Sequence, residues 1–128
     1  MNWRFISRAA LLLLHDESLA EHGGAGGLRD EGLLESALAR PHNLIAYGDP
    51  DVFALAAAYA HGLVRNHPFT DGNKRAAFLA AGLFLALNGY RIAATQVEAT
   101  LTMVALASSE MGEDEFADWL RNHSAHRR

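Results

Sequence analysis

The chain has 128 residues, no cysteine and a formal net charge of −4, with 50% hydrophobic and 20% charged residues. This balance is typical of a folded domain and excludes a disordered chain, a disulfide scaffold, a thiolate metal site and a broad polyanion-binding surface. The length fits one domain, which we expect to span residues 1–128.

The apolar runs are short. The run AALLLL has six residues and ends at His15, which is too short for the apolar region of a signal peptide. The run 76–87 has twelve residues, whereas a membrane span needs about 18 or more. We therefore expect a cytoplasmic protein that makes no contact with a membrane.

Apolar residues recur at helical spacing along nearly the whole chain, and alternating strand patterns are absent, which predicts an all-α fold. Asp30, and Thr95 together with Glu98, have the residue types that begin helices. The glycine-rich stretch 23–27 predicts a flexible turn after the first helix. We expect six helices, at about 3–20, 30–40, 51–65, 73–88, 95–109 and 113–123.

Residues 41–50, PHNLIAYGDP, are bracketed by prolines and contain a Tyr-Gly-Asp turn pattern. Proline lacks a backbone N–H group and clashes with the preceding helical turn. We therefore expect the second helix to end before Pro41, and residues 41–50 to form an extended loop or a small hairpin.

The most informative stretch is HPFTDGNKR, residues 67–75, which lies between two strongly apolar helical patterns. The helix that follows, at about 73–88, is apolar on nearly all sides and is predicted to be the central, buried helix. A polar loop held between two packed helices is a common place for a functional site.

The simplest interpretation of this loop is a tight corner, in which Pro68 stiffens the chain and Asp71-Gly72 makes the turn. That interpretation leaves Lys74 and Arg75 unexplained. Two cations in the first turn of a helix face the positive end of its dipole, at a cost of roughly 0.3–1 kcal/mol each. Their position is reasonable if an anion binds there.

A helix N-terminus preceded by a glycine and followed by basic side chains has the parts of a phosphate site. Gly72 allows close approach, Asn73 offers an amide donor, and Lys74 and Arg75 supply positive charge. Asp71 fits such a site if Mg²⁺ enters together with the phosphates, so the loop predicts a site for ATP and Mg²⁺.

His67 stands at the start of the same loop. A histidine beside a phosphate site can take the proton from an attacking hydroxyl group, so we expect His67 to be a general base. The other six histidines have no spacing suited to a shared metal ion, and no function is assigned to them.

The stretch HPFTDGNKRAAF resembles the signature of the Fic/Doc superfamily, HxFx(D/E)(G/A)N(G/K)R. Residues 27–41, GLRDEGLLESALARP, are similar to the upstream segment of its death-on-curing branch. The resemblance extends over residues 15–120. It implies a six-helix bundle whose central helix follows the motif loop, as in toxins of bacterial toxin–antitoxin pairs.

Carried over by position, the resemblance implies that His67 is the general base and Asp71 the Mg²⁺ ligand. It implies that Asn73, Lys74 and Arg75 hold phosphate groups.

The resemblance also implies that Phe69 is a buried anchor of the loop. It places residues 41–50 where the family has a flap that aligns the target peptide by strand-like pairing, with Ile45 and Tyr47 as candidate contacts.

One motif position divides the family. Members that transfer AMP carry glycine at the position of Lys74, whereas the death-on-curing branch carries lysine and is associated with transfer of the γ-phosphate. Pro68 and Gly72 are more usual in the AMP-transferring members, so this motif combines features of both groups.

The leading hypothesis is a toxin that transfers the γ-phosphate of ATP to a Ser or Thr hydroxyl of a bacterial protein. The resemblance implies a translation elongation factor as the target. The first alternative is an adenylyl or other nucleotidyl transferase, and the second is an inactive module that binds a phosphate group or an antitoxin. A nuclease is less favoured, because the loop has a single carboxylate, and no direct binding of nucleic acid is expected.

Family members that restrain themselves carry a helix with the pattern Ser/Thr-x-x-x-Glu-Gly/Asn, whose glutamate pairs with the motif arginine. The candidates at Glu31 and Glu113 each lack one of the flanking residues that the pattern requires. We therefore expect inhibition in trans by a separate antitoxin.

Overall fold

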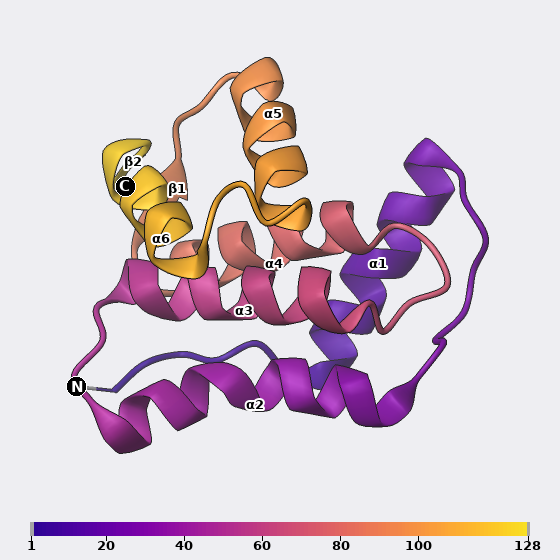
Figure 1. Cartoon of the computed structure of the whole chain (residues 1–128), viewed down its shortest axis with the longest axis horizontal. Helices are drawn as coiled ribbons and strands as arrows, with labels where there is room; N and C mark the ends of the chain where they lie inside the picture. Colours follow the sequence, from indigo (N-terminus) through magenta and orange to yellow (C-terminus); the bar gives the residue numbers. More distant parts are fainter. Residues whose placement is uncertain (1, 128) are drawn as a thin grey trace.

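The structure of the protein is a computed structural model that describes residues 2–127. Over these residues the chain forms six helices and one two-stranded antiparallel sheet (Figure 1). The elements in order are α1 (Arg8–His22), α2 (Glu31–Tyr47), α3 (Val52–Asn66), α4 (Asn73–Leu87), β1 (Tyr90–Ile92), α5 (Gln96–Ala107), α6 (Glu113–Asn122) and β2 (Ser124–His126). The predicted all-α class is confirmed, and the sheet only ties the end of the chain to the turn after α4, with Arg91 opposite Ala125.

The core is built around α3 and α4, which lie side by side and antiparallel (Figure 1). Both helices are rich in fully buried small residues, including the runs 56–58 and 76–77, which let neighbouring helices approach closely. Phe84 and Tyr59 fill the space between them with their rings 5.4 Å apart. The helix that follows the 67–75 loop is therefore buried, as predicted.

The first helix begins later than predicted, at Arg8, because Ser7 caps it by accepting a hydrogen bond from the Ala10 N–H. The preceding residues are extended and lie on the core. Trp3 packs near Phe84 with ring centroids 6.4 Å apart, and the Ile6 N–H donates to the Tyr59 hydroxyl at 3.1 Å. The apolar residues of this segment pack against the core, although the segment is not helical.

The prediction that the second helix ends before Pro41 is wrong, because α2 continues through Pro41 to Tyr47. Proline inside a helix costs about 3 kcal/mol through a lost hydrogen bond and a clash. Here the ring of Pro41 is fully buried on the side of α2 that also buries Leu34 and Ala37 against α3. Burial against a neighbouring helix outweighs the local preference of proline. The residues around Pro41 in the sequence do not indicate this burial.

The contact between α2 and α3 is close at Gly62, where an added Cβ would lie 3.2 Å from the Ala37 Cα. We expect Gly62→Val to lower the free energy of unfolding by about 1–3 kcal/mol, because the larger side chain forces the two helices apart. Gly82→Ala on α4 is the matched control, since its Cβ would have an ordinary 3.8 Å contact to Ile92. Urea unfolding measures both variants, and equal stabilities would contradict the tight contact.

Over the described residues, no helix combines the length and the apolar character that crossing a bilayer requires.

Candidate active site

The candidate site is the loop 67–72, which connects the end of α3 to the start of α4. His67 follows the last residue of α3 in the left-handed conformation, with φ 51° and ψ 54°, and its N–H donates to the Leu63 carbonyl at 3.1 Å. This conformation costs about 1–3 kcal/mol for a residue with a Cβ and persists only where neighbouring groups hold it. The His67 side chain is exposed to solvent.

The loop is anchored by Phe69, whose side chain is 1% exposed. The Asn73 amide closes the loop around it, since its Oδ1 accepts from the Phe69 N–H and its Nδ2 donates to the Phe69 carbonyl, both at 3.0 Å. Asn73 is itself buried. Its side chain therefore braces the loop, a role that comes in addition to the phosphate contact expected from the sequence.

A second support comes from His15 on α1, which is 2% exposed and had no predicted function. Its ring stacks on Phe69, with centroids 3.7 Å apart and planes 10° from parallel, and its Nε2–H donates to the Asp71 carbonyl at 2.8 Å. The sequence feature that could have indicated the burial of His15 is its position four residues after Leu11, on the same face of α1.

Asp71 is exposed, and its carboxylate is oriented by backbone groups. Its Oδ1 accepts from the Gly72 N–H at 2.8 Å, and its Oδ2 accepts from the Ala25 N–H at 3.3 Å. These two hydrogen bonds, with smaller contributions from Arg75 and His15, lower the pKa of Asp71 below its ordinary value. The group is therefore an anion at neutral pH with lone pairs left to bind a cation.

The segment that runs beside the loop is 23–30, between α1 and α2. The Thr70 N–H donates to the Gly27 carbonyl at 3.1 Å, and Leu28 forms an antiparallel bridge with Phe69. Gly24 has φ 123°, and an added Cβ there would lie 2.9 Å from Asp71 Oδ2. This close approach requires glycine. The glycine-rich stretch therefore packs closely against the loop and is not only a flexible turn.

The predicted flap at 41–50 is wrong in both conformation and place. Ile45 and Tyr47 belong to the last turns of α2, and both side chains are exposed. The end of α2 lies near the start of α3, whereas His67 follows the end of α3 (Figure 1). The 15 residues of α3 separate the two ends by about 22 Å. The physical cause is the packing of α2 against α3, which offsets the local cost of Pro41 and leaves the segment helical.

The N-terminus of α4 opens toward solvent. Gly72 precedes it with φ 76° and provides no side-chain cap, and the first backbone hydrogen bond of the helix is donated by Ala76. Lys74 and Arg75 are exposed, and within residues 2–127 their side chains make no hydrogen bond or ion pair. Free N–H groups and two unpaired cations at one helix end favour an anion.

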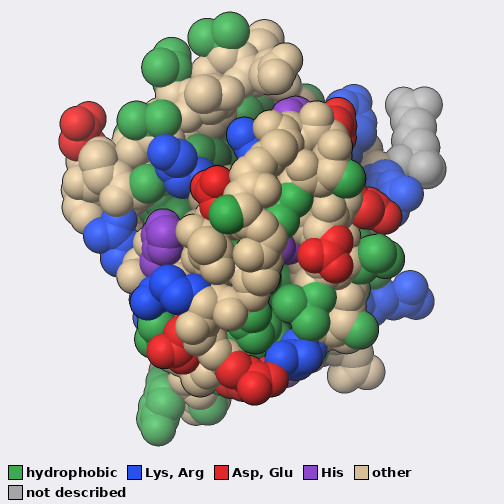
Figure 2. Space-filling model, turned by 90° about the vertical axis from the view of Figure 1, so that its right-hand side faces the viewer, with side chains coloured by type: hydrophobic (Ala, Val, Ile, Leu, Met, Phe, Trp, Pro, Cys, Tyr) green, Lys and Arg blue, Asp and Glu red, His purple; other side chains and the backbone are tan. Residues whose placement is uncertain are grey.

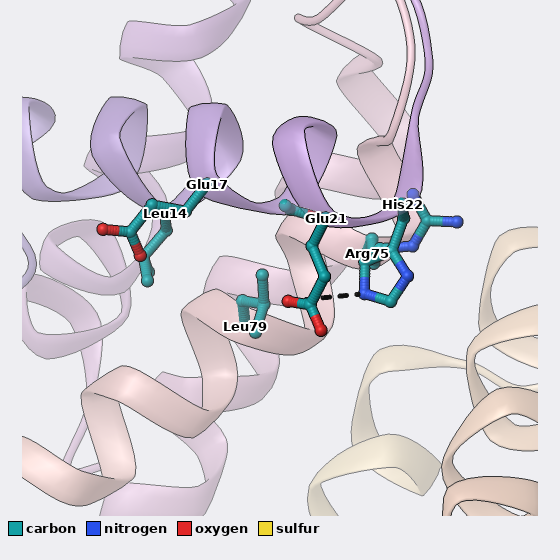
Figure 3. Close-up of a pocket in the computed structure, with 7 residues that line it drawn as sticks. Leu14, Glu17, Glu21, His22, Arg75 and Leu79 are labelled. Carbon is teal, nitrogen blue, oxygen red and sulfur yellow. Dashed lines mark ion pairs between the residues drawn. The ribbon is translucent and has the colours of Figure 1, made fainter.

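A small pocket of about 140 Å³ lies between α1 and α4 next to the loop (Figure 3). Arg75 is at its rim, and Glu21 and His22 of α1 pair with each other at 3.8 Å. Buried Ser18 contributes a hydroxyl that has no hydrogen-bond partner. The complete lining consists of Leu14, Glu17, Ser18, Glu21, His22, Arg75 and Leu79.

Charge on this end of the molecule is mixed. Figure 2 shows basic, acidic and histidine side chains interspersed on the face that lies at the right of Figure 1, with no continuous basic area. Within the described part of the chain, no group of three or more His, Cys, Asp or Glu side chains could hold a metal ion. A cation at Asp71 would therefore depend on ligands that the substrate brings.

The sequence model of the Fic/DOC family matches residues 5–85, which include α1, α2, α3, the loop and most of α4. The chain belongs to the Fic/Doc family. Two curated Fic/Doc relatives extend the comparison. The chain is 37% identical over 119 residues to "Protein kinase doc" of Escherichia phage P1, covering 92% of this chain and 94% of that protein. It is 46% identical over 74 residues to "Toxin Doc" of Mycolicibacterium smegmatis, covering 56% of this chain and 57% of that protein.

The family match includes the loop 67–72. The match to the phage protein covers nearly the full length of both chains, so the similarity extends beyond residues 5–85.

Proposed function

We propose that the protein is a bacterial toxin that phosphorylates a Ser or Thr hydroxyl of a cytoplasmic protein, with ATP as the phosphate donor and Mg²⁺ as the cofactor. The observation that carries the proposal is the N-terminus of α4, where N–H groups without a side-chain cap meet Lys74 and Arg75, which have no ion pair within residues 2–127. Such an end binds the phosphates of a nucleotide. A relative that is 37% identical has the name protein kinase, which favours phosphoryl transfer.

The residues present fit a magnesium ion. The Asp71 carboxylate is exposed, ionised at neutral pH and next to the helix end that would hold the phosphates. When bound, Mg²⁺ would neutralise charge on the phosphate oxygens, and Asp71 is the residue that would hold it.

The proposed reaction has two parts for the protein to perform. His67 accepts the proton of the target hydroxyl while the hydroxyl oxygen forms a bond to the γ-phosphorus, and the bond from that phosphorus to the ADP oxygen breaks. Lys74 and Arg75 stabilise the negative charge on the phosphate oxygens. The exposed His67 side chain is free for this role, since it makes no hydrogen bond within residues 2–127.

Nucleotidyl transfer is the alternative, and Pro68 and Gly72 favour it. The same base and helix end would then attack the α-phosphorus. Lys74 separates the two reactions, because its ammonium group adds charge and volume at the start of α4, where AMP-transferring members have only glycine.

Labelled ATP tests the choice. The purified chain, incubated with bacterial lysate and Mg²⁺, is expected to label a protein from ATP that carries the isotope on the γ-phosphate, and not from ATP that carries it on the α-phosphate. Lys74→Gly is expected to reduce γ-labelling. Strong α-labelling by the unsubstituted chain would contradict phosphoryl transfer.

A separate antitoxin is the expected partner, and a translation elongation factor is the proposed target. The names of the relatives as Doc proteins and as a toxin support the first of these. Within the described residues no carboxylate forms an ion pair with Arg75, so the chain does not neutralise its own motif arginine. This supports inhibition by a separate antitoxin.

A further inference from the structure

Arg29 lies outside the motif but contacts the backbone at the end of α3. Its Nε donates to the His67 carbonyl at 2.8 Å, and its Nη2 donates to the Asn66 carbonyl at 3.0 Å. Its own backbone N–H donates to the Pro68 carbonyl at 2.7 Å, as does the Asp30 N–H at 3.0 Å. Arg29 and Asp30 therefore bind three consecutive carbonyls, from the last residue of α3 to Pro68.

The end of α3 needs such donors. The last carbonyls of a helix have no intrahelical partner and carry the negative end of the helix dipole, so a guanidinium group there is favourable. The planar fork of an arginine can donate to two carbonyls at once, whereas a lysine offers a point charge on a flexible stem.

The contacts hold His67 on both sides. Its N–H is bound by the Leu63 carbonyl, its own carbonyl by Arg29, and the next carbonyl, of Pro68, by the backbone of Arg29 and Asp30. Fixing the two peptide groups that flank a residue fixes its φ and ψ, and with them the direction of its Cα–Cβ bond. A residue before proline favours the extended region, so the left-handed conformation of His67, with φ 51°, depends on these contacts.

We propose that Arg29 is a positioning residue that holds His67 in its left-handed conformation and thereby sets where the imidazole points. The inference rests on the proposed role of His67 as the general base. Misplacing a catalytic group by about 1 Å lowers a rate by roughly 100-fold, so the effect of losing Arg29 is measurable.

The test compares Arg29→Ala and Arg29→Lys with the control Arg8→Ala. Arg8 on α1 bonds to Glu31 and Glu35 of α2, and within residues 2–127 its side chain makes no hydrogen bond to the loop. Two readouts are measured for each protein. One is the initial rate of γ-labelling in bacterial lysate as a function of ATP concentration, and the other is the exchange of individual backbone amide hydrogens, followed by NMR.

We expect Arg29→Ala to lower the maximal rate by about 10- to 100-fold while the KM for ATP changes by no more than about twofold. The amides of His67, Phe69 and Thr70 are expected to exchange faster, and amides in the middle of α3 to be unchanged. Guanidinium ion at a concentration that does not denature the protein should restore part of the rate of Arg29→Ala. Arg29→Lys should recover less than the full rate, and Arg8→Ala should behave as the unsubstituted chain.

An unchanged maximal rate in folded Arg29→Ala, or an equal loss in Arg8→Ala, would overturn the inference. If Arg29→Ala does not fold, Arg29→Lys decides by the same readouts. If the unsubstituted chain labels no protein, the proposed function fails on its own, and amide exchange still tests Arg29. Equal exchange at His67 in all variants would then show that Arg29 does not hold it.

Discussion

Replacing His67 by alanine is expected to lower phosphoryl transfer by about 10²–10⁴-fold, the range that a general base contributes. The fold should be unaffected, because the side chain is exposed and makes no hydrogen bond within residues 2–127. The measurement is γ-labelling in lysate together with growth arrest on expression in bacteria, at matched protein levels.

His42→Ala is the matched control for this variant. His42 is also an exposed histidine, but it lies on α2 against Phe5, at 4.1 Å between ring centroids, far from the loop. Full labelling and growth arrest are expected in the control. If His67→Ala still arrests growth at equal expression, His67 is not the general base.

Replacing Arg75 by alanine is expected to weaken the binding of ATP with Mg²⁺ by roughly 10- to 100-fold, because a hydrogen bond to a charged group contributes about 1.5–3 kcal/mol. The guanidinium group is exposed and unpaired within the described residues, so the free energy of unfolding should hardly change. Titration calorimetry with ATP and Mg²⁺ measures the dissociation constant.

Arg91→Ala serves as the control for charge alone. Arg91 is an exposed arginine on β1, which follows the far end of α4 from the loop. Its loss changes the net charge equally and should leave nucleotide affinity unchanged. An equal loss of nucleotide affinity in both variants would mean that the net charge of the protein, and not a contact of Arg75, sets the affinity. Unchanged affinity in Arg75→Ala would place the phosphate site elsewhere.

Local sequence signals predicted much of this fold. Asp30, Asp51 and Thr95 begin their helices as N-caps, and Glu98 completes the capping box that its spacing from Thr95 indicates. These features depend on residues three or four positions apart, so they can be read directly from the chain. The place of the motif loop between two buried helices follows from the same short-range patterns.

The errors involve contacts between residues distant in sequence. Pro41 lies inside α2 because its ring packs against α3, and the local preference of proline contains no information about that neighbour. The extended loop expected at 41–50 came from the same local preference, and the resemblance placed a flap there. The glycines at 23–27 suggested flexibility, whereas Gly24 is needed because the chain passes close to Asp71.

The residues that hold the loop in place could not be predicted either, because their contacts also join residues that the sequence alone does not show to be neighbours. Asn73 has the residue type of a phosphate donor, and only the fold shows that its amide is bonded to Phe69. His15 and Arg29 approach the loop from more than 30 residues away in sequence. The sequence indicates which groups carry the chemistry, and the structure shows which groups hold them.

The most direct test of the account is the mass of the modified target. The protein labelled by the unsubstituted chain is isolated from the lysate, digested and analysed by mass spectrometry, with His67→Ala as the blank. The account predicts one phosphate group on a Ser or Thr side chain, absent from the blank. An adenylyl group on that side chain would contradict it, as would a phosphate that also appears with His67→Ala.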